Sequence, residues 1–191
     1  MKKRTYELGN NRVLKVSKNC QEIIFTDKST GKYCCFSQSR WATFMLIIDE
    51  IEMTLQKVLA GQKDIRYRYH LGAAWHVSVT SGFKCIDFRR FFLPLEQTDI
   101  KPTRTGLALR ISEWQTLRSV ITKLHVDQSE IANCVPCFLS ADHTTAEGIR
   151  CCSECTSFGH QSVNDVEDAH ALSTSTSTAT TSSSAAEATT H

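Results

Sequence analysis

Cations and aromatic side chains occur together in the stretch from Lys84 to Arg104. Two arginines and two phenylalanines end the segment FKCIDFRRFF, and a lysine and an arginine follow in KPTRTG. Cations bind the phosphates of a single strand, and aromatic faces stack on its bases at about 1–3 kcal/mol each. The pattern therefore predicts a surface that binds single-stranded nucleic acid. Its candidate residues are Arg89, Arg90, Phe92, Lys101, Arg104, Lys84 and Trp75.

A second group of residues has the spacing of metal ligands. Cys134 and Cys137 form one C-x2-C pair, and Cys152 and Cys155 form another, with fourteen residues between the pairs. Two thiolate pairs of this kind can complete one tetrahedral zinc site. Few apolar residues lie between the pairs, so the metal would have to supply most of the folding free energy. The sequence thus indicates a zinc site at these four cysteines, and the alternative is a cysteine-bearing tail without metal.

Regular elements have to position the basic and aromatic residues. Polar and apolar residues alternate in Tyr69–Val79 and again in Phe83–Phe92, which predicts two strands. A polar loop with two cations follows, and Leu107–Ile111 alternates once more. Ser112 stands at a helix N-cap position, and Trp114 opens a stretch with apolar residues at helical spacing. We expect strand, strand, basic loop, short strand and amphipathic helix, in that order.

Taken together, these features resemble the positive cofactor four family of transcriptional coactivators, which bind single-stranded DNA. Five separated features keep the family's order and spacing: an aromatic-x-aliphatic-Gly opening, a Val-Ser-Val strand, an Asp-x-Arg strand, a Lys-Pro-x-Arg-x-Gly loop and a tryptophan that opens the helix. Their residues here are Tyr69, Leu71, Gly72, Val77, Ser78, Val79, Asp87, Arg89, Phe91, Phe92, Lys101, Pro102, Arg104, Gly106 and Trp114. The chain departs from the pattern at Phe92, where the family has tryptophan, and at Thr105, where it has lysine.

The resemblance implies roles for individual residues. Arg89, Lys101 and Arg104 would contact phosphates, and Phe92 would stack on bases. Arg90 and Lys84 would be additional cations, with Trp75 as a further stacking residue. Phe83 is a candidate for the family's aromatic in the first hairpin. The resemblance also implies that two such units pack through their helices and present their sheets as binding surfaces.

The beginning of the chain repeats the opening of this stretch. Tyr6–Val16 aligns on Tyr69–Val79 without gaps, at an offset of 63 residues. Two further expected strands, Glu22–Thr26 and Tyr33–Phe36, are followed by a helix capped by Ser39. The first copy lacks the Lys-Pro-x-Arg-x-Gly loop. A tandem repeat allows one chain to supply both halves of a dimer.

The sequence therefore predicts an α+β fold with two strands-then-helix repeats, each a curved antiparallel sheet followed by an amphipathic helix, forming an intramolecular pseudo-dimer. We expect a shortened repeat in 1–61, a full single-stranded-DNA-binding repeat in 62–127, a Cys-rich segment in 128–160 and a disordered Ser/Thr/Ala tail in 161–191.

Charge is divided unevenly along the chain. Residues 1–125 hold 21 Lys and Arg against 11 Asp and Glu, whereas residues 126–191 hold 1 against 9. A basic body with an acidic tail favours a partner that is a polyanion. The basic start is followed by no apolar core of a signal peptide, and no apolar run is long enough to span a bilayer. We expect a reducing compartment and, with the family resemblance, the nucleus.

These observations predict a nuclear single-stranded-DNA-binding protein that acts as a transcriptional coactivator, at melted promoters or on replication and repair DNA. Proteins of the transcription machinery are candidate partners, and a further homodimer stays open. No constellation of catalytic residues is evident, so we expect no enzyme. The alternatives are a protein-interaction scaffold with degenerate DNA binding and an RNA-binding protein.

Overall fold

The computed structural model describes residues 4–139 and 141–155. All of them belong to one compact unit, residues 1–161. The expected disordered tail, 161–191, lies outside the described residues.

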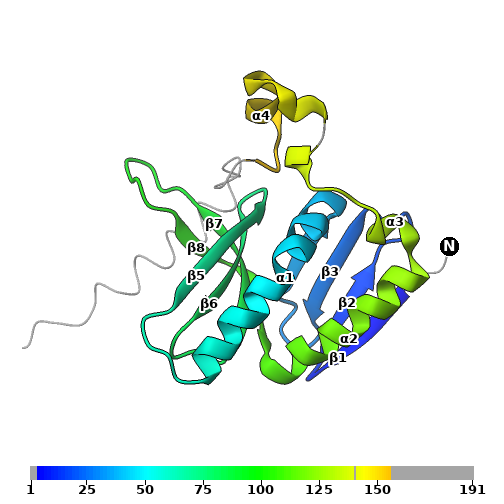
Figure 1. The fold of residues 1–191 in the computed structure, drawn as a ribbon, viewed down its shortest axis with the longest axis vertical. Coiled ribbons are helices and arrows are strands. Elements are labelled where there is room, and N and C mark those ends of the chain that lie inside the picture. The colour runs from blue at the N-terminus through cyan, green and yellow to red at the C-terminus, as the bar shows by residue number, and fades with distance from the viewer. Residues whose placement is uncertain (1–3, 140, 156–191) are drawn as a thin grey trace, which may run out of the picture. The chain divides into compact units, whose positions relative to one another are not determined.

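Each repeat forms a four-stranded antiparallel sheet with its strands in chain order (Figure 1). The first sheet consists of β1 (Arg4–Gly9), β2 (Arg12–Val16), β3 (Glu22–Asp27) and β4 (Tyr33–Ser37), and α1 (Gln38–Leu59) follows it. The second consists of β5 (Arg66–Gly72), β6 (Trp75–Thr80), β7 (Cys85–Phe92) and β8 (Lys101–Arg110), and α2 (Ile111–Asp127) follows it. The predicted α+β class with two strands-then-helix repeats is confirmed.

The stretch Tyr69–Val79 was expected to be one strand but forms a hairpin. Gly72 ends β5 at φ +135°, and Ala73 and Ala74 form the turn with φ of 47° and 67°. The first repeat turns in the same way at Asn10 and Asn11. Positive φ is common for asparagine and uncommon for alanine, so the residue types of Ala73 and Ala74 do not indicate a turn.

The basic loop is largely a strand. β8 begins at Lys101 and runs to Arg110, and its register with β7 shifts between Arg89 and Phe91, where Arg90 of β7 faces the three residues 103–105 of β8. The offset between the repeats grows from 63 residues at the first hairpins to 73 at the helices. The β7–β8 hairpin is therefore the place where the second repeat is longer, by ten residues.

Both helices pack across the boundary between the repeats. α1 contacts β5 and β6 of the second repeat, and α2 contacts β1 of the first (Figure 1). Each also contacts its own sheet, α1 at β4 and α2 at β8. Ser37 caps α1 by accepting a hydrogen bond from Arg40 N, two residues before the expected cap. α2 begins at Ile111, so Ser112 lies inside it.

Aromatic rings join the two repeats in one core. Phe88 of β7 lies with its ring centroid 5.6 Å from that of Phe25, 5.7 Å from Phe36 and 5.4 Å from Phe44. All four side chains are fully buried. Phe25, Phe36 and Phe44 belong to the first repeat, and Phe88 belongs to the second. Separating the repeats would therefore expose buried aromatic surface of both.

Short elements follow α2. They are α3 (Ser129–Ala132), the 3₁₀ turns η1 (Cys137–Leu139) and η2 (Ala141–Thr144), and α4 (Ala146–Cys151). Within residues 4–139 and 141–155, no helix is both long enough and apolar enough to cross a membrane.

Candidate nucleic-acid interface and metal site

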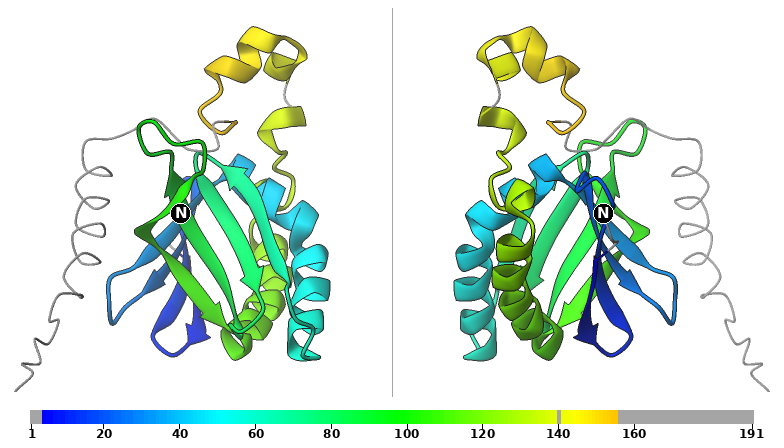
Figure 2. Two further views of the ribbon diagram at one scale, coloured as in Figure 1. Left: turned by 90° about the vertical axis from the view of Figure 1, so that its left-hand side faces the viewer. Right: turned by 90° about the vertical axis from the view of Figure 1, so that its right-hand side faces the viewer.

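The sheet β5–β8 has one face against the helices and one face turned away from them. Val77, Val79, Ile86 and Phe88 are fully buried on the helix side. The residues that alternate with them point to the other side, which we call the outer face; the left view of Figure 2 shows this sheet with the helices behind it. Cross-strand register assigns Arg66, Arg68 and His70 of β5 to the outer face, opposite Thr80, Ser78 and His76 of β6.

The outer face has a basic character. Arg66 and Arg68 are exposed on it. Lys101 and Arg104 are exposed beside it on β8, Lys101 opposite Phe92 and Arg104 within the register shift between β7 and β8. Among the paired positions of this face in the described strands, Asp87 is the single carboxylate. On the first sheet, Lys28 at the β3–β4 turn is paired with Glu7 of β1 at 2.7 Å.

Arg89 is held in place by its neighbours within the chain. Its Nε and Nη2 donate to the two carboxylate oxygens of Asp87 at 2.9 and 3.0 Å, and its Nη1 donates to the carbonyl of Thr103 at 3.0 Å. A bidentate pair of this kind fixes a guanidinium and shares its charge. Arg89 is thus less available to phosphate than the sequence implied, although a quarter of its side chain is still exposed.

Gly106 explains how β7 and β8 approach at this point. A Cβ at position 106 would lie 2.5 Å from the carbonyl oxygen of Phe88 and 2.9 Å from Cα of Arg89, and the residue has φ +157°. Only glycine fits there without moving β7. The glycine of the Lys-Pro-x-Arg-x-Gly motif therefore sets the position of Arg89.

A small aromatic layer lies beneath the arginines. The guanidinium of Arg68 lies 5.1 Å from the ring centroid of Phe91, and the ring of Phe91 lies 4.8 Å from that of His76. His76 is buried, and its Nδ1 lies 3.0 Å from the carbonyl oxygen of Ala74. Burial lowers the pKa of His76 from 6.5 to about 4. The neutral imidazole therefore packs here and adds no charge near pH 7.

One predicted stacking residue needs correction. Trp75 begins β6 on the helix side, is only 6% exposed and belongs to the core. It has no free face for a base, because the Ala73–Ala74 turn directs it inward. Phe92 is half-buried at the start of the β7–β8 extension, opposite Lys101. Phe83, by contrast, is 64% exposed at the β6–β7 turn.

The predicted cations lie at two ends of the sheet. Lys84 is exposed beside Phe83, whereas Arg90, Lys101 and Arg104 lie toward the β7–β8 hairpin. Arg90 pairs with Trp75 in the sheet register, so its side chain starts from the helix side and not from the outer face. Sequence reasoning missed Arg66 and Arg68, although the alternation Arg66-Tyr-Arg68-Tyr-His70 was a usable signal.

The Cys-rich segment brings four potential metal ligands together. Cys137, His143, Cys152 and Cys155 place one ligand atom each so that all four lie within 4.8 Å of one another. Cys137 Sγ lies 3.7 Å from Cys155 Sγ, and His143 Nε2 lies 3.0 Å from the same sulfur. Zn–S bonds of about 2.3 Å in a tetrahedron put two sulfurs about 3.8 Å apart. The cluster could hold a metal such as zinc.

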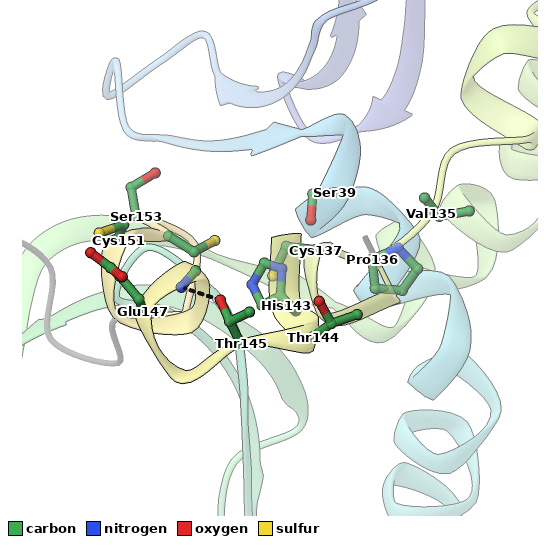
Figure 3. A pocket seen from close by; sticks show the side chains of 12 residues that line it. Ser39, Val135, Pro136, Cys137, His143, Thr144, Thr145, Glu147, Cys151 and Ser153 are labelled. Atoms are coloured by element: carbon green, nitrogen blue, oxygen red, sulfur yellow. Dashed lines mark hydrogen bonds between the residues drawn. The ribbon is translucent and has the colours of Figure 1, made fainter. Parts of the chain in front are cut away.

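Three of the four predicted cysteines are in this cluster and the fourth is not. Cys134 Sγ donates to the carbonyl of Ile131 at 2.9 Å, and His143 completes the set in its place. Spacing alone could not make this choice, because His143 also lies between the two C-x2-C pairs and imidazole is an equally good zinc ligand. Figure 3 shows Cys137 and His143 close together, with Ser39 of α1 nearby.

The surroundings of the cluster suit a cation that arrives from solvent. A pocket of about 880 Å³, lined by Cys137, His143 and Cys152 among others, gives access to it (Figure 3). Burial, followed by hydrogen bonds with the neighbouring thiols of Cys137 and Cys152, raises the pKa of Cys155 to about 12. A thiol in that state is protonated, so an incoming ion would have to displace the proton.

Comparison of the chain with protein-family models, with curated proteins and with solved structures found no match.

Proposed function

We propose that this protein binds single-stranded DNA on the outer face of β5–β8. The observation that supports this most directly is the excess of exposed cations on and beside this face, over one carboxylate that is already paired with Arg89. Arg66 and Arg68 lie on the face itself, and Lys101 and Arg104 lie beside it in the first part of β8. Phosphate contacts from such cations supply sequence-independent affinity. Phe83, at the β6–β7 turn, would supply stacking, and Phe92, which its register places on the other side of the sheet, would contribute less.

The resemblance to the positive cofactor four coactivators gives this chemistry a biological setting. Under the proposal the protein acts in the nucleus as a transcriptional coactivator, on promoter DNA that has been melted or on replication and repair intermediates. The two repeats would take the roles of the two subunits, with the second repeat supplying most of the binding surface because only it has the extended β7–β8 hairpin.

The test is fluorescence anisotropy of the full chain with a 20-nucleotide single strand and with the matching duplex, across a salt series. We expect preference for the single strand and a log–log salt slope that grows by about 0.7 for each phosphate contact. Arg66→Ala with Arg104→Ala should weaken binding at least tenfold. The control, Lys57→Ala with Lys123→Ala, removes the same charge from exposed helix positions and should have little effect.

Two results would contradict the proposal. Equal, weak binding of strand and duplex would favour the protein-interaction scaffold. Equal losses in the two double variants would show that net charge alone, and not the outer face, carries the affinity. A single-stranded RNA of the same sequence distinguishes the RNA-binding alternative, because tighter binding to RNA requires recognition of the 2′-hydroxyl.

We also propose that the metal of the Cys-rich segment is zinc, held by Cys137, His143, Cys152 and Cys155. Three thiolates and one imidazole are a set that zinc prefers in closed structural sites. Zinc bound there would supply folding free energy to a segment with few buried apolar side chains. Titration of the reduced full chain with zinc, against a chromophoric chelator, should give one equivalent per chain.

A further inference from the structure

The two repeats contact each other at two equivalent places, which we call joints, where the first hairpin of one repeat meets the start of the helix that follows the other sheet. At the first joint, side chains of the two repeats contact each other directly. There the β1–β2 hairpin touches the start of α2. Asn10 Nδ2 donates to Glu113 Oε1 at 3.0 Å, and the guanidinium of Arg12 lies 3.9 Å from the other oxygen of Glu113. Glu113 is only 1% exposed. A buried carboxylate thus links the hairpin of one repeat to the helix of the other.

The second joint has different residues at the equivalent positions. Sixty-three residues after Arg12 stands Trp75, and 73 residues before Glu113 stands Arg40. Neither residue is acidic, and the hydrogen-bonding pair of the first joint cannot form. Here the start of α1 presents a guanidinium and the capping Ser37 to the β5–β6 hairpin.

A carboxylate from the Cys-rich segment occupies this second joint. Glu154 Oε2 accepts from Arg40 Nε at 2.8 Å, and its Oε1 accepts from Arg40 Nη2 at 3.0 Å and from Ser37 Oγ at 2.8 Å. Its backbone carbonyl accepts from the amide of Ala73 at 3.0 Å, at the turn of the β5–β6 hairpin. Both side chains of the ion pair are largely buried, Arg40 at 14% and Glu154 at 16% exposure.

The fit around Glu154 is close on the hairpin side as well. A side chain at Gly72 would collide with the Glu154 carboxylate and would lie 2.8 Å from Cγ of Arg40. Glu154 therefore touches both repeats at once: the helix start of the first through its carboxylate, and the hairpin of the second through its carbonyl.

Glu154 also stands between two candidate ligands, Cys152 and Cys155. Fixing both cysteines on one ion leaves the intervening residues little freedom. We propose that the metal site is a clamp that closes the second joint between the repeats, by presenting Glu154 to Arg40 and Ala73. The inference rests on the proposed zinc site, and it makes that site a part of the pseudo-dimer.

Thermodynamic linkage makes the clamp measurable. An ion that binds only when Glu154 is docked stabilises the folded chain, and the docked contacts in turn strengthen ion binding by the same factor. The design uses the reduced full chain, stripped of metal by a chelator, with zinc ion as the probe. Glu154→Gln breaks the pair with Arg40, and Glu96→Gln, at an exposed position of the β7–β8 hairpin outside the metal pocket, is the matched control.

For the unmodified chain we expect zinc to raise the melting temperature by about 5–10 °C. Glu154→Gln should still bind one zinc, about tenfold more weakly, with less than half of that thermal gain. Arg40→Gln should behave in the same way, and the double variant should be no worse than either single one. Hydrogen exchange at the Ala73 amide should slow on zinc addition in the unmodified chain and not in Glu154→Gln.

The outcomes separate the two proposals. If Glu154→Gln keeps the zinc affinity, the thermal gain and the protection of the Ala73 amide, the clamp is wrong and the zinc site stands. If the unmodified chain binds no zinc, both are wrong. The single-strand binding of the outer face is measured independently of either result.

Discussion

The indole of Trp41 donates to His125 Nε2 at 3.2 Å, and the indole of Trp114 donates to Glu52 Oε2 at 2.5 Å. Trp41 and Trp114 are 73 residues apart, and so are Glu52 and His125. The two hydrogen bonds are therefore equivalent under exchange of the repeats, and each runs from the helix of one repeat to the helix of the other. This is the contact pattern expected of a dimer built within a single chain.

Replacement of either tryptophan should destabilise both repeats together and not one repeat alone. Both indoles are fully buried. Trp41→Phe or Trp114→Phe removes an indole donor and part of the packed ring, so the free energy of unfolding should fall by about 1–3 kcal/mol in each case. Denaturant unfolding followed by circular dichroism measures the change.

The unfolding transition should remain single in both variants, because Phe88 and the first-repeat aromatics share one cluster. Leu46→Ala, at an exposed position of α1, is the control and should change stability little. Two separated transitions in either tryptophan variant would show that the repeats fold independently.

Stacking and phosphate binding on the outer face should be separable. Phe83 is an exposed aromatic and Arg66 an exposed cation, and Arg66 pairs with Thr80 close to the turn that carries Phe83. Phe83→Ala should cost about 1–3 kcal/mol of single-strand binding and leave the salt slope unchanged. Arg66→Ala should lower the slope by about 0.7. Anisotropy titrations at four salt concentrations measure both quantities.

Leu95→Ala is the control for Phe83→Ala, since Leu95 is a still more exposed apolar residue at the β7–β8 hairpin. A change of salt slope in Phe83→Ala, or no loss of affinity, would count against stacking at this position.

Sequence patterns were sufficient for the parts of the fold that repeat. The alignment of Tyr6–Val16 on Tyr69–Val79 predicted two equivalent units, and alternation placed Ile86 and Phe88 on the face opposite Asp87 and Arg89. Trp75 was misassigned because the turn before it is formed by two alanines at positive φ, which composition does not signal. A strand pattern without a visible turn cannot show where a hairpin reverses.

Contacts between residues far apart in the sequence were the other feature that could not be predicted. Glu154 and Arg40 are 114 residues apart, and nothing near either residue indicates the other. His143 was one of several histidines, and its selection over Cys134 depends on how η1 and η2 fold. The asymmetry between the two joints becomes evident only after Arg12 and Trp75, and Glu113 and Arg40, are superposed as equivalent positions.

Stability should decline in mild acid because of His76. Burial lowers its pKa in the folded chain to about 4, and His70 and Arg68 lower it further against the opposing hydrogen bond to Ala74. In the unfolded chain the imidazole titrates near 6.5, so between these values only the unfolded state binds the proton. The contribution is intact above about pH 6.5 and is lost as the pH falls toward 4, with a total of about 3 kcal/mol. Denaturant unfolding at half-unit pH steps should therefore give a steeper profile for the unmodified chain than for His76→Gln, and parallel profiles from pH 6.5 to 4 would show that His76 is not held neutral.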